Sequence, residues 1–338
     1  MGLKLSILDQ SPIHENETAA DAFRHTIELA QKAEAWGYHR FWVSEHHDSD
    51  AVVGSSPEVL ISYLLAHTKR IRVGSGGVML QHYSPYKVAE NFNVLAALAP
   101  GRVDLGIGRA PGGLPRATRA LQQNEEGTAT RTLGEKLVEL DRYLNGTLEP
   151  EHPLYGIRAV PVPEKPSDLY LLGASTSSAE LAASLGIPYV FAQFINGEEQ
   201  MLYDSLSTYR SQFQTGKALQ PHAIVALSVI LTDTDEEARQ LAADSKNVKI
   251  HLESGRTLTV KSIGHAEEFG RQSNEKYTIE VKQANIIHGS KETVRSKLLE
   301  IQKSYGVEEF IIVMAIPNFE KRVRAYELLK EAFSEQPV

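Results

Sequence analysis

The chain has 338 residues, of which 42% are apolar and 23% charged, and its formal net charge is −8. This is the composition of a folded globular protein, and the acidic balance without a block of Lys and Arg argues against nucleic acid as the main partner. The absence of cysteine excludes disulfides, cysteine-based metal sites and thiol nucleophiles. No apolar run approaches the roughly 20 residues that span a membrane, and Asp9 follows the first apolar run too early for a signal peptide. We therefore expect a cytoplasmic protein.

The first part of the chain alternates short apolar runs with longer helical patterns. Helical spacing over residues 20–36 ends at Gly37, and Ser56 followed by Pro57 is typical of the start of a helix. The next helical pattern ends before Pro100. These patterns predict strands at residues 3–8, 40–44, 71–74 and 103–108, and helices at 20–36, 57–68 and 85–98.

The second part of the chain repeats this order. The patterns predict strands at residues 169–172, 189–192, 223–231 and 309–313, and helices at 131–144, 177–185, 198–213, 235–252, 291–305 and 319–333. Eight strands, each followed by helical sequence, predict an α/β fold with a (β/α)8 TIM barrel as one domain over residues 1–338. A doubly wound open sheet is the alternative. Residues 110–130 and 255–288 do not fit the repeat, and stretches of this length are usually lids, binding loops or disordered.

In a barrel the functional site lies at the carboxyl ends of the strands. The second strand is followed by His46 and His47, with Glu45 and Asp48 beside them. An imidazole can hold or pass a proton near neutral pH, and either acid could fix its tautomer. The alternative for such a pair is a solvated loop with one imidazole bonded to backbone. Adjacent residues point to opposite faces, so they rarely serve one ion, and we assign no metal site.

Three further segments follow successive strands. Gly76 and Gly77 permit close approach of a flat ligand to the main chain, although a plain turn is the alternative. Arg109 lies in a Gly-rich loop and suits a phosphate or carboxylate, with a surface salt bridge as the alternative. Ser175 and Ser178 open a helix, where hydroxyls and backbone N–H groups bind anions or simply cap the helix. Together these segments predict a site for a phosphorylated planar cofactor beside proton chemistry.

The chain resembles the bacterial luciferase-like flavin monooxygenase family, in particular its non-luminescent single-chain branch. The resemblance rests on an ordered set of motifs: Ala35-Trp36-Gly37-Tyr38, Phe41-Trp42-Val43-Ser44-Glu45-His46-His47, Arg72-Val73-Gly74-Ser75-Gly76-Gly77-Val78, Pro85-Tyr86-Lys87-Val88-Ala89-Glu90, Gly101-Arg102-Val103-Asp104-Leu105-Gly106-Ile107-Gly108-Arg109, Gly173-Ala174-Ser175-Thr176-Ser177-Ser178-Ala179-Glu180-Leu181-Ala182-Ala183 and Ile286-Ile287-His288-Gly289-Ser290.

The resemblance implies a barrel enzyme that uses reduced FMN and O2, through a flavin hydroperoxide, to oxygenate a small organic substrate. His46 matches the catalytic histidine beside the flavin, with His47 next to it. Arg109, Ser175 and Ser178 match the FMN phosphate site, and Gly76-Gly77 falls where the family has an often cis non-proline peptide under the isoalloxazine ring. Gly108 replaces the luciferase cysteine before that arginine, so light emission is not expected.

The resemblance also implies partners. Because the chain lacks a GxGxxG dinucleotide fingerprint, a separate NAD(P)H-dependent flavin reductase would supply the reduced FMN. Residues 255–288 match the family's mobile lid in position, between strands seven and eight. A homodimer through helices 57–68 and 85–98 is expected. Three alternatives remain open: a deazaflavin-dependent oxidoreductase of the same fold, a non-catalytic flavin-binding subunit, and an unrelated barrel enzyme acting on a phosphorylated sugar.

Overall fold

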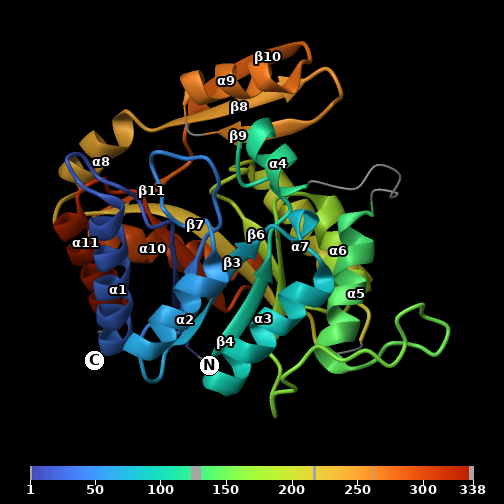
Figure 1. Ribbon diagram of the computed structural model, residues 1–338. Coiled ribbons are helices and arrows are strands. Elements are labelled where there is room, and N and C mark those ends of the chain that lie inside the picture. Colours follow the sequence, from blue (N-terminus) through green and yellow to red (C-terminus); the bar gives the residue numbers. More distant parts are fainter. Residues whose placement is uncertain (1, 123–130, 216–217, 261, 335–338) are drawn as a thin grey trace.

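The computed structural model describes residues 2–122, 131–215, 218–260 and 262–334. Eight parallel strands pair with their neighbours and close into a barrel, since β6 pairs with β7 and β12 with both β7 and β1 (Figure 1). The predicted TIM barrel is therefore confirmed. The barrel strands are β1 (Lys4–Asp9), β2 (Arg40–Val43), β3 (Arg72–Val78), β4 (Val103–Ile107), β5 (Asp168–Gly173), β6 (Tyr189–Ala192), β7 (Ala223–Leu231) and β12 (Glu309–Met314).

Helices surround the barrel, and local capping chemistry explains where several of them begin. Thr18 and Thr132 each form a capping box with an acid three residues later, and Gly37 ends the first helix with a φ of 75°. Among the described residues no helix is long and apolar enough to cross a membrane. The helices are α1 (Ala19–Trp36), α2 (Pro57–His67), α3 (Pro85–Leu98), α4 (Pro115–Leu121), α5 (Leu133–Asn145), α6 (Thr176–Ser184), α7 (Glu199–Gln212), α8 (Asp235–Ala243), α10 (Lys291–Tyr305) and α11 (Phe319–Ser334), with a 3-10 turn η1 (Leu80–His82).

One predicted helix is wrong in its second half. The helix expected over residues 235–252 ends at Ala243, and β8 (Lys246–Leu252) follows. The reason is visible in the burial of alternate residues Val248, Ile250 and Leu252, which is the period of a strand rather than a helix. This strand pairs with β9 (Thr257–Val260) and β10 (Tyr277–Gln283) in an antiparallel sheet.

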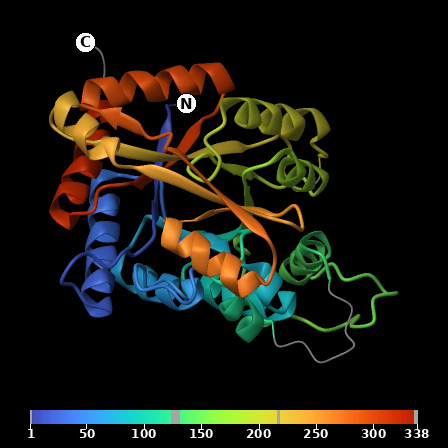
Figure 2. The same cartoon turned by 90° about the horizontal axis from the view of Figure 1, so that it is seen from above.

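The three-stranded sheet and α9 (Ile263–Ser273) form an insertion between β7 and β12, which also contains the short strand β11 (Ile287–Gly289). The insertion lies over the carboxyl ends of the barrel strands (Figures 1 and 2). It has its own small apolar core, to which Leu114 from the segment after β4 contributes beside Phe269. The inserted structure thus begins earlier than residue 255, at Lys246.

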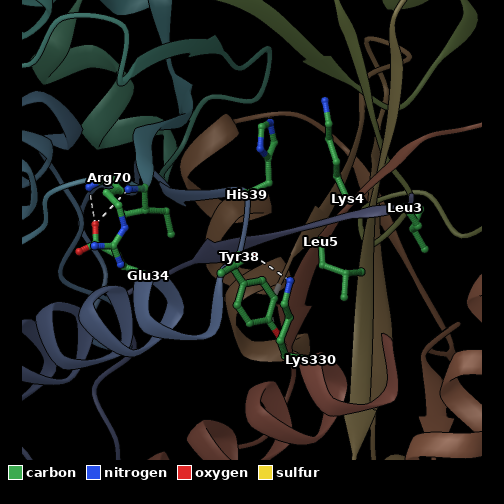
Figure 3. Close-up of a pocket in the computed structure, with 10 residues that line it drawn as sticks. Leu3, Lys4, Leu5, Glu34, Tyr38, His39, Arg70 and Lys330 are labelled. Carbon is green, nitrogen blue, oxygen red and sulfur yellow. Dashed lines mark hydrogen bonds between the residues drawn. The ribbon is translucent and has the colours of Figure 1, made fainter. Parts of the chain in front are cut away.

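The amino end of the barrel is closed by buried charges. Arg40 donates to Glu309 over 2.7 Å and to Asp104 over 2.8 Å, and its side chain is 3% exposed. Arg72 also pairs with Asp104. Below this layer a pocket of about 350 Å³ opens at the surface, lined by Lys4, His39 and eight other residues (Figure 3). We call this layer of ion-paired side chains at the amino end, formed by Arg40, Arg72, Asp104 and Glu309, the charged plug.

Strand β3 extends to Val78, further than the predicted residues 71–74, so it includes the glycines that were expected in a loop after it. Gly74 to Gly77 lie within the strand rather than in a loop after it. A Cβ on Gly77 would meet the Gly106 carbonyl oxygen at 2.7 Å, and one on Gly74 would meet the Asp104 carbonyl oxygen at 2.5 Å. Glycine at these positions therefore allows β3 and β4 to approach closely.

Candidate active site

The loop after β2 is organised around the carboxylate of Glu45, whose side chain is fully buried. This carboxylate accepts hydrogen bonds from the Met79 backbone N–H at 3.0 Å and from the Tyr83 hydroxyl at 2.8 Å. It also lies 2.8 Å from Nε2 of His47. This contact favours the His47 tautomer with a proton on Nε2, because a carboxylate oxygen accepts hydrogen bonds. Burial and the adjacent Glu45 raise the pKa of Tyr83, so its hydroxyl stays a donor. Glu45 therefore positions His47.

His46 has a different set of partners from its neighbour. Its backbone N–H donates to the Gly54 carbonyl at 2.7 Å, and its Nδ1 lies 3.1 Å from the Ser44 hydroxyl. Both imidazoles are half-buried. The structure thus holds His47 against a buried anion and His46 against a hydroxyl, so the two rings have different environments for proton transfer.

The segment after β4 packs directly on the histidine loop. The His47 backbone N–H donates to the Gly112 carbonyl at 2.8 Å, and the Gly112 backbone is left-handed, with a φ of 68°. On the other side, Nε2 of His82 donates to the Pro111 carbonyl at 2.7 Å. These bonds fix the course of the chain that carries Arg109 past the carboxyl end of the barrel.

Arg109 reaches the start of α6. Its guanidinium is exposed and donates from Nη1 to the Ser177 hydroxyl at 2.7 Å. Ser175 is the N-cap of α6, and its hydroxyl lies 3.0 Å from that of Ser177. An exposed guanidinium, two hydroxyls and the first N–H groups of a helix form a donor set for an anion.

Ser178 takes a different position from the one that the sequence suggests. Its side chain is buried, and its hydroxyl donates to the Ser175 carbonyl at 2.7 Å and lies 2.9 Å from the Tyr189 hydroxyl. Burial raises the pKa of Tyr189 to about 12. The hydroxyl beside Arg109 is therefore that of Ser177, which sequence reasoning quoted in the motif but did not select. The sequence has four consecutive hydroxyl residues at 175–178, and nothing in it indicates which of these side chains is exposed.

Gly76 and Gly77 lie near the end of β3, where Gly77 is buried against β4. Gly76 is half-buried, and a Cβ there would meet Leu8 at 2.7 Å and Trp42 at 3.2 Å. The peptide between the two glycines is cis. These residues, the histidine loop and the Arg109 segment all belong to the carboxyl ends of β2 to β5, so the predicted site residues share one end of the barrel.

Tyr83 is a site residue that the sequence analysis missed. It follows η1, and its hydroxyl lies 3.4 Å from Nε2 of His47, with which it shares Glu45. Nothing in the spacing along the chain signals this contact, because the two side chains are separated by 36 residues.

The model of the luciferase-like monooxygenase family matches residues 3–308. The chain belongs to this family. It is 44% identical to the N-acetyl-S-alkylcysteine monooxygenase of Bacillus subtilis (strain 168) over 330 residues, 98% of each protein. Among solved structures, apo-MsnO8 is similar with a TM-score of 0.78 and 34% identity, covering 100% of this chain and 99% of that one. The predicted family and enzyme class, a flavin-dependent monooxygenase, are confirmed.

A more distant structure shares the fold alone. It is the oxygenating constituent of 3,6-diketocamphane monooxygenase from Pseudomonas putida in complex with FMN, with a TM-score of 0.69 and 18% identity, covering 98% of this chain and 97% of that one.

Proposed function

We propose that the chain is an FMN-dependent monooxygenase that uses reduced FMN and O2 to oxygenate a small organic substrate. The observation that carries the proposal is the pairing of Arg109 with Ser177 at the start of α6, at the barrel end that also bears His46 and His47. The FMN complex of the distant 3,6-diketocamphane enzyme supports the same cofactor.

The residues present fit this cofactor. A phosphate dianion matches the guanidinium of Arg109, the hydroxyls of Ser175 and Ser177 and the helix N-terminus. Because Gly76 and Gly77 have no side chains, a flat ring could approach the half-buried main chain of Gly76 closely. Ser178, which the resemblance also assigns to the phosphate site, would support it indirectly, because its backbone N–H and its hydroxyl both donate to Ser175 and hold the start of α6 in place.

Reduced FMN, when bound, supplies the electrons for the activation of O2. The protein then has to manage protons and exclude water. His46 is the proposed catalytic residue that holds or moves a proton at an imidazole nitrogen, and His47 stands beside it with Glu45 fixing its tautomer. The insertion of β8 to β10 and α9 is the proposed lid, including the predicted mobile stretch 255–288, and would exclude water from above.

The proposed substrate class is a small thioether of the N-acetyl-S-alkylcysteine type. The support is the name of the 44% identical relative, which aligns over 98% of both proteins. One oxygen atom of O2 would enter the organic substrate and the other would leave as water, with reduced FMN as the two-electron donor.

Two partners complete the proposal. A separate NAD(P)H-dependent reductase would deliver reduced FMN. A second copy of the chain would cover α2 and α3, where Val59, Tyr63, Val94 and Leu98 are 43–68% exposed. Cytoplasmic location stays a prediction.

The proposal is tested by the oxygen reaction of the bound cofactor. The protein is mixed anaerobically with reduced FMN, then with O2, and the rate of FMN reoxidation is compared with that of free reduced FMN, with and without an N-acetyl-S-alkylcysteine. We expect tight binding, reoxidation slower than in free solution, and an oxygenated thioether product.

Two results would contradict the proposal. If reduced FMN does not bind while a reduced deazaflavin does, the chain is a deazaflavin-dependent oxidoreductase. If reduced FMN binds but reoxidises at the free rate with and without substrates, the chain is a flavin-binding subunit.

A further inference from the structure

A cluster of three potential metal ligands lies at the carboxyl end of β1, apart from the histidine loop. His14 and Glu17 belong to the loop between β1 and α1, and His25 belongs to α1 itself. The ligand atoms of the three side chains all lie within 4.8 Å of one another. Nδ1 of His25 is 3.4 Å from Oε2 of Glu17.

The backbone holds these three side chains together. The Glu17 N–H donates to the His14 carbonyl at 3.1 Å, which closes a turn, and Asn16 within that turn is left-handed, with a φ of 62°. The His14 N–H donates to Oε2 of Glu17 at 3.3 Å. The His25 ring is stacked on Phe319 of α11, with centroids 3.8 Å apart and an interplanar angle of 10°. The cluster is therefore preorganised by the fold.

Two imidazole nitrogens in this cluster have no hydrogen-bond partner in the part of the chain that the structure describes. They are Nε2 of His14 and Nδ1 of His25, and both atoms are buried. A buried polar atom without a hydrogen bond is destabilising, so a cation that bonds to both nitrogens would be bound favourably.

We propose that His14, Glu17 and His25 bind a divalent cation of the zinc class. Two imidazoles and a carboxylate are a common donor set for zinc, and bonds of about 2.0–2.2 Å in a tetrahedral site separate ligand atoms by roughly 3.3–3.6 Å. The measured separation of His25 and Glu17, 3.4 Å, meets this requirement. A water molecule would take the fourth position.

The charge balance permits a cation at this site. The Arg322 guanidinium is a nearby positive group, and it donates to Oδ1 of Asp9 at 3.0 Å, so this carboxylate offsets part of its charge. Glu17 adds a further negative charge. The bound cation would fasten the β1–α1 loop to α1 at the mouth of the barrel. This role does not depend on the proposed function at the histidine loop.

The test is metal binding by the full chain without an affinity tag and stripped of metal with a chelator. Co2+ titration followed by visible absorption, and Zn2+ competition against a chromogenic chelator, should each show one equivalent bound. Zn2+ should also raise the melting temperature. Glu17→Gln and His14→Ala should each lower the Zn2+ affinity by more than about 100-fold, because loss of a direct ligand should exceed the 10–100-fold typical of supporting residues.

His251→Ala is the matched control. Nε2 of His251 lies 3.5 Å from Oε2 of Glu280, so the two residues form a His–Glu pair as His25 and Glu17 do, but this pair is exposed and His251 is not part of the three-ligand cluster. This variant should bind one equivalent as the wild type does. The proposal is overturned if the wild type binds no stoichiometric Co2+ or Zn2+, or if Glu17→Gln binds Zn2+ as tightly as the wild type. Glu17→Gln keeps the shape of a partly exposed side chain, and its circular dichroism verifies the fold.

Discussion

The two ends of the barrel use charged residues in opposite ways. At the amino end Arg40 is bonded to Glu309, Asp104 and Tyr170, and its side chain is 3% exposed. At the carboxyl end Arg109 is exposed and donates from one nitrogen to Ser177. A guanidinium whose donors are used within the protein stabilises the fold, whereas one with donors to spare can receive a ligand. We therefore expect Arg40 to contribute to the stability of the fold and Arg109 to contribute to ligand binding.

Among the variants, Arg40→Ala should cause the largest loss in the free energy of unfolding. Removing this buried cation takes from Glu309 the cation that pairs with it and leaves Asp104 paired with Arg72, and breaking a buried ion pair from one side typically costs about 3–5 kcal/mol. We expect a loss of this size in the free energy of unfolding, measured by urea denaturation. Arg72→Ala is the control, since Arg72 shares Asp104 but its side chain is 18% exposed, and its loss should be smaller. An equal loss in both variants would contradict the idea of a plug centred on Arg40.

His46→Ala tests the carboxyl end. Loss of a general acid or base typically lowers turnover by 10²–10⁴, about 3–5 kcal/mol in barrier, and we expect at least the lower value with FMN affinity nearly unchanged. The measurements are steady-state turnover with a supplied reductase and FMN binding by fluorescence. His47→Ala should in addition lower stability, because buried Glu45 then loses a donor. If His46→Ala instead weakens FMN binding and leaves turnover intact, His46 is structural.

Arg109→Ala should weaken FMN binding by about 1.5–3 kcal/mol, the range for a hydrogen bond to a charged group. The free energy of unfolding should change little, because the side chain is exposed. Titration of FMN fluorescence measures the first quantity and urea denaturation the second.

Ser177→Ala and Ser178→Ala form a matched pair for the same site. The Ser177 hydroxyl is exposed beside Arg109, so its removal should weaken FMN binding by up to about 1.5 kcal/mol and leave stability unchanged. The Ser178 hydroxyl is bonded within the protein, so its removal should lower stability and leave FMN affinity unchanged. The reversed pattern would restore Ser178 as the hydroxyl that binds phosphate.

The sequence predicted most of the barrel, because its strands and helices depend on local patterns. The barrel followed from periodicity and caps, which are local. The predicted boundaries of its eight strands lie within two residues of the structure except at β3, whereas β8, β9, β10 and β11 were not predicted as strands. At β3 the run Gly74 to Gly77 looked like a turn, because glycine is usually read as a break, although here it permits close strand packing. At β8 the alternation of Val248, Ile250 and Leu252 was hidden by the preceding helical pattern.

Contacts between distant residues were the part that could not be predicted. The sequence indicated that an acid would orient a histidine, but not that Glu45 rather than Asp48 does so, nor that Tyr83 joins them. It offered Ser175 and Ser178 beside Arg109, where the structure selects Ser177. The cluster of His14 and His25 depends on a left-handed turn and on stacking against α11. Each of these contacts depends on the direction in which a side chain points from a loop or a helix turn, and the spacing of residues along the sequence does not specify that direction.

An effect that depends on pH is expected from His39, at the pocket below the charged plug (Figure 3). Burial, and then the charge of Arg40, lower its pKa from 6.5 to about 4, with Lys4 acting in the same direction and Glu309 opposing it. The unfolded chain therefore binds a proton on this residue between about pH 6.5 and 4, while the folded chain does not. Stability contributed by neutral His39 is complete above pH 6.5 and falls as the pH decreases toward 4.

The size of this loss is about 1–2 kcal/mol once solvent screening at a partly exposed imidazole is allowed for. Urea denaturation at several pH values between 7 and 4.5 measures it. In His39→Gln, whose side chain does not titrate, the dependence should become shallower by that amount, while the Arg109→Ala variant should keep the full wild-type slope. An unchanged slope in His39→Gln would mean that the pocket at the amino end does not disfavour the imidazolium, and that this end tolerates charge as readily as the exposed carboxyl end does.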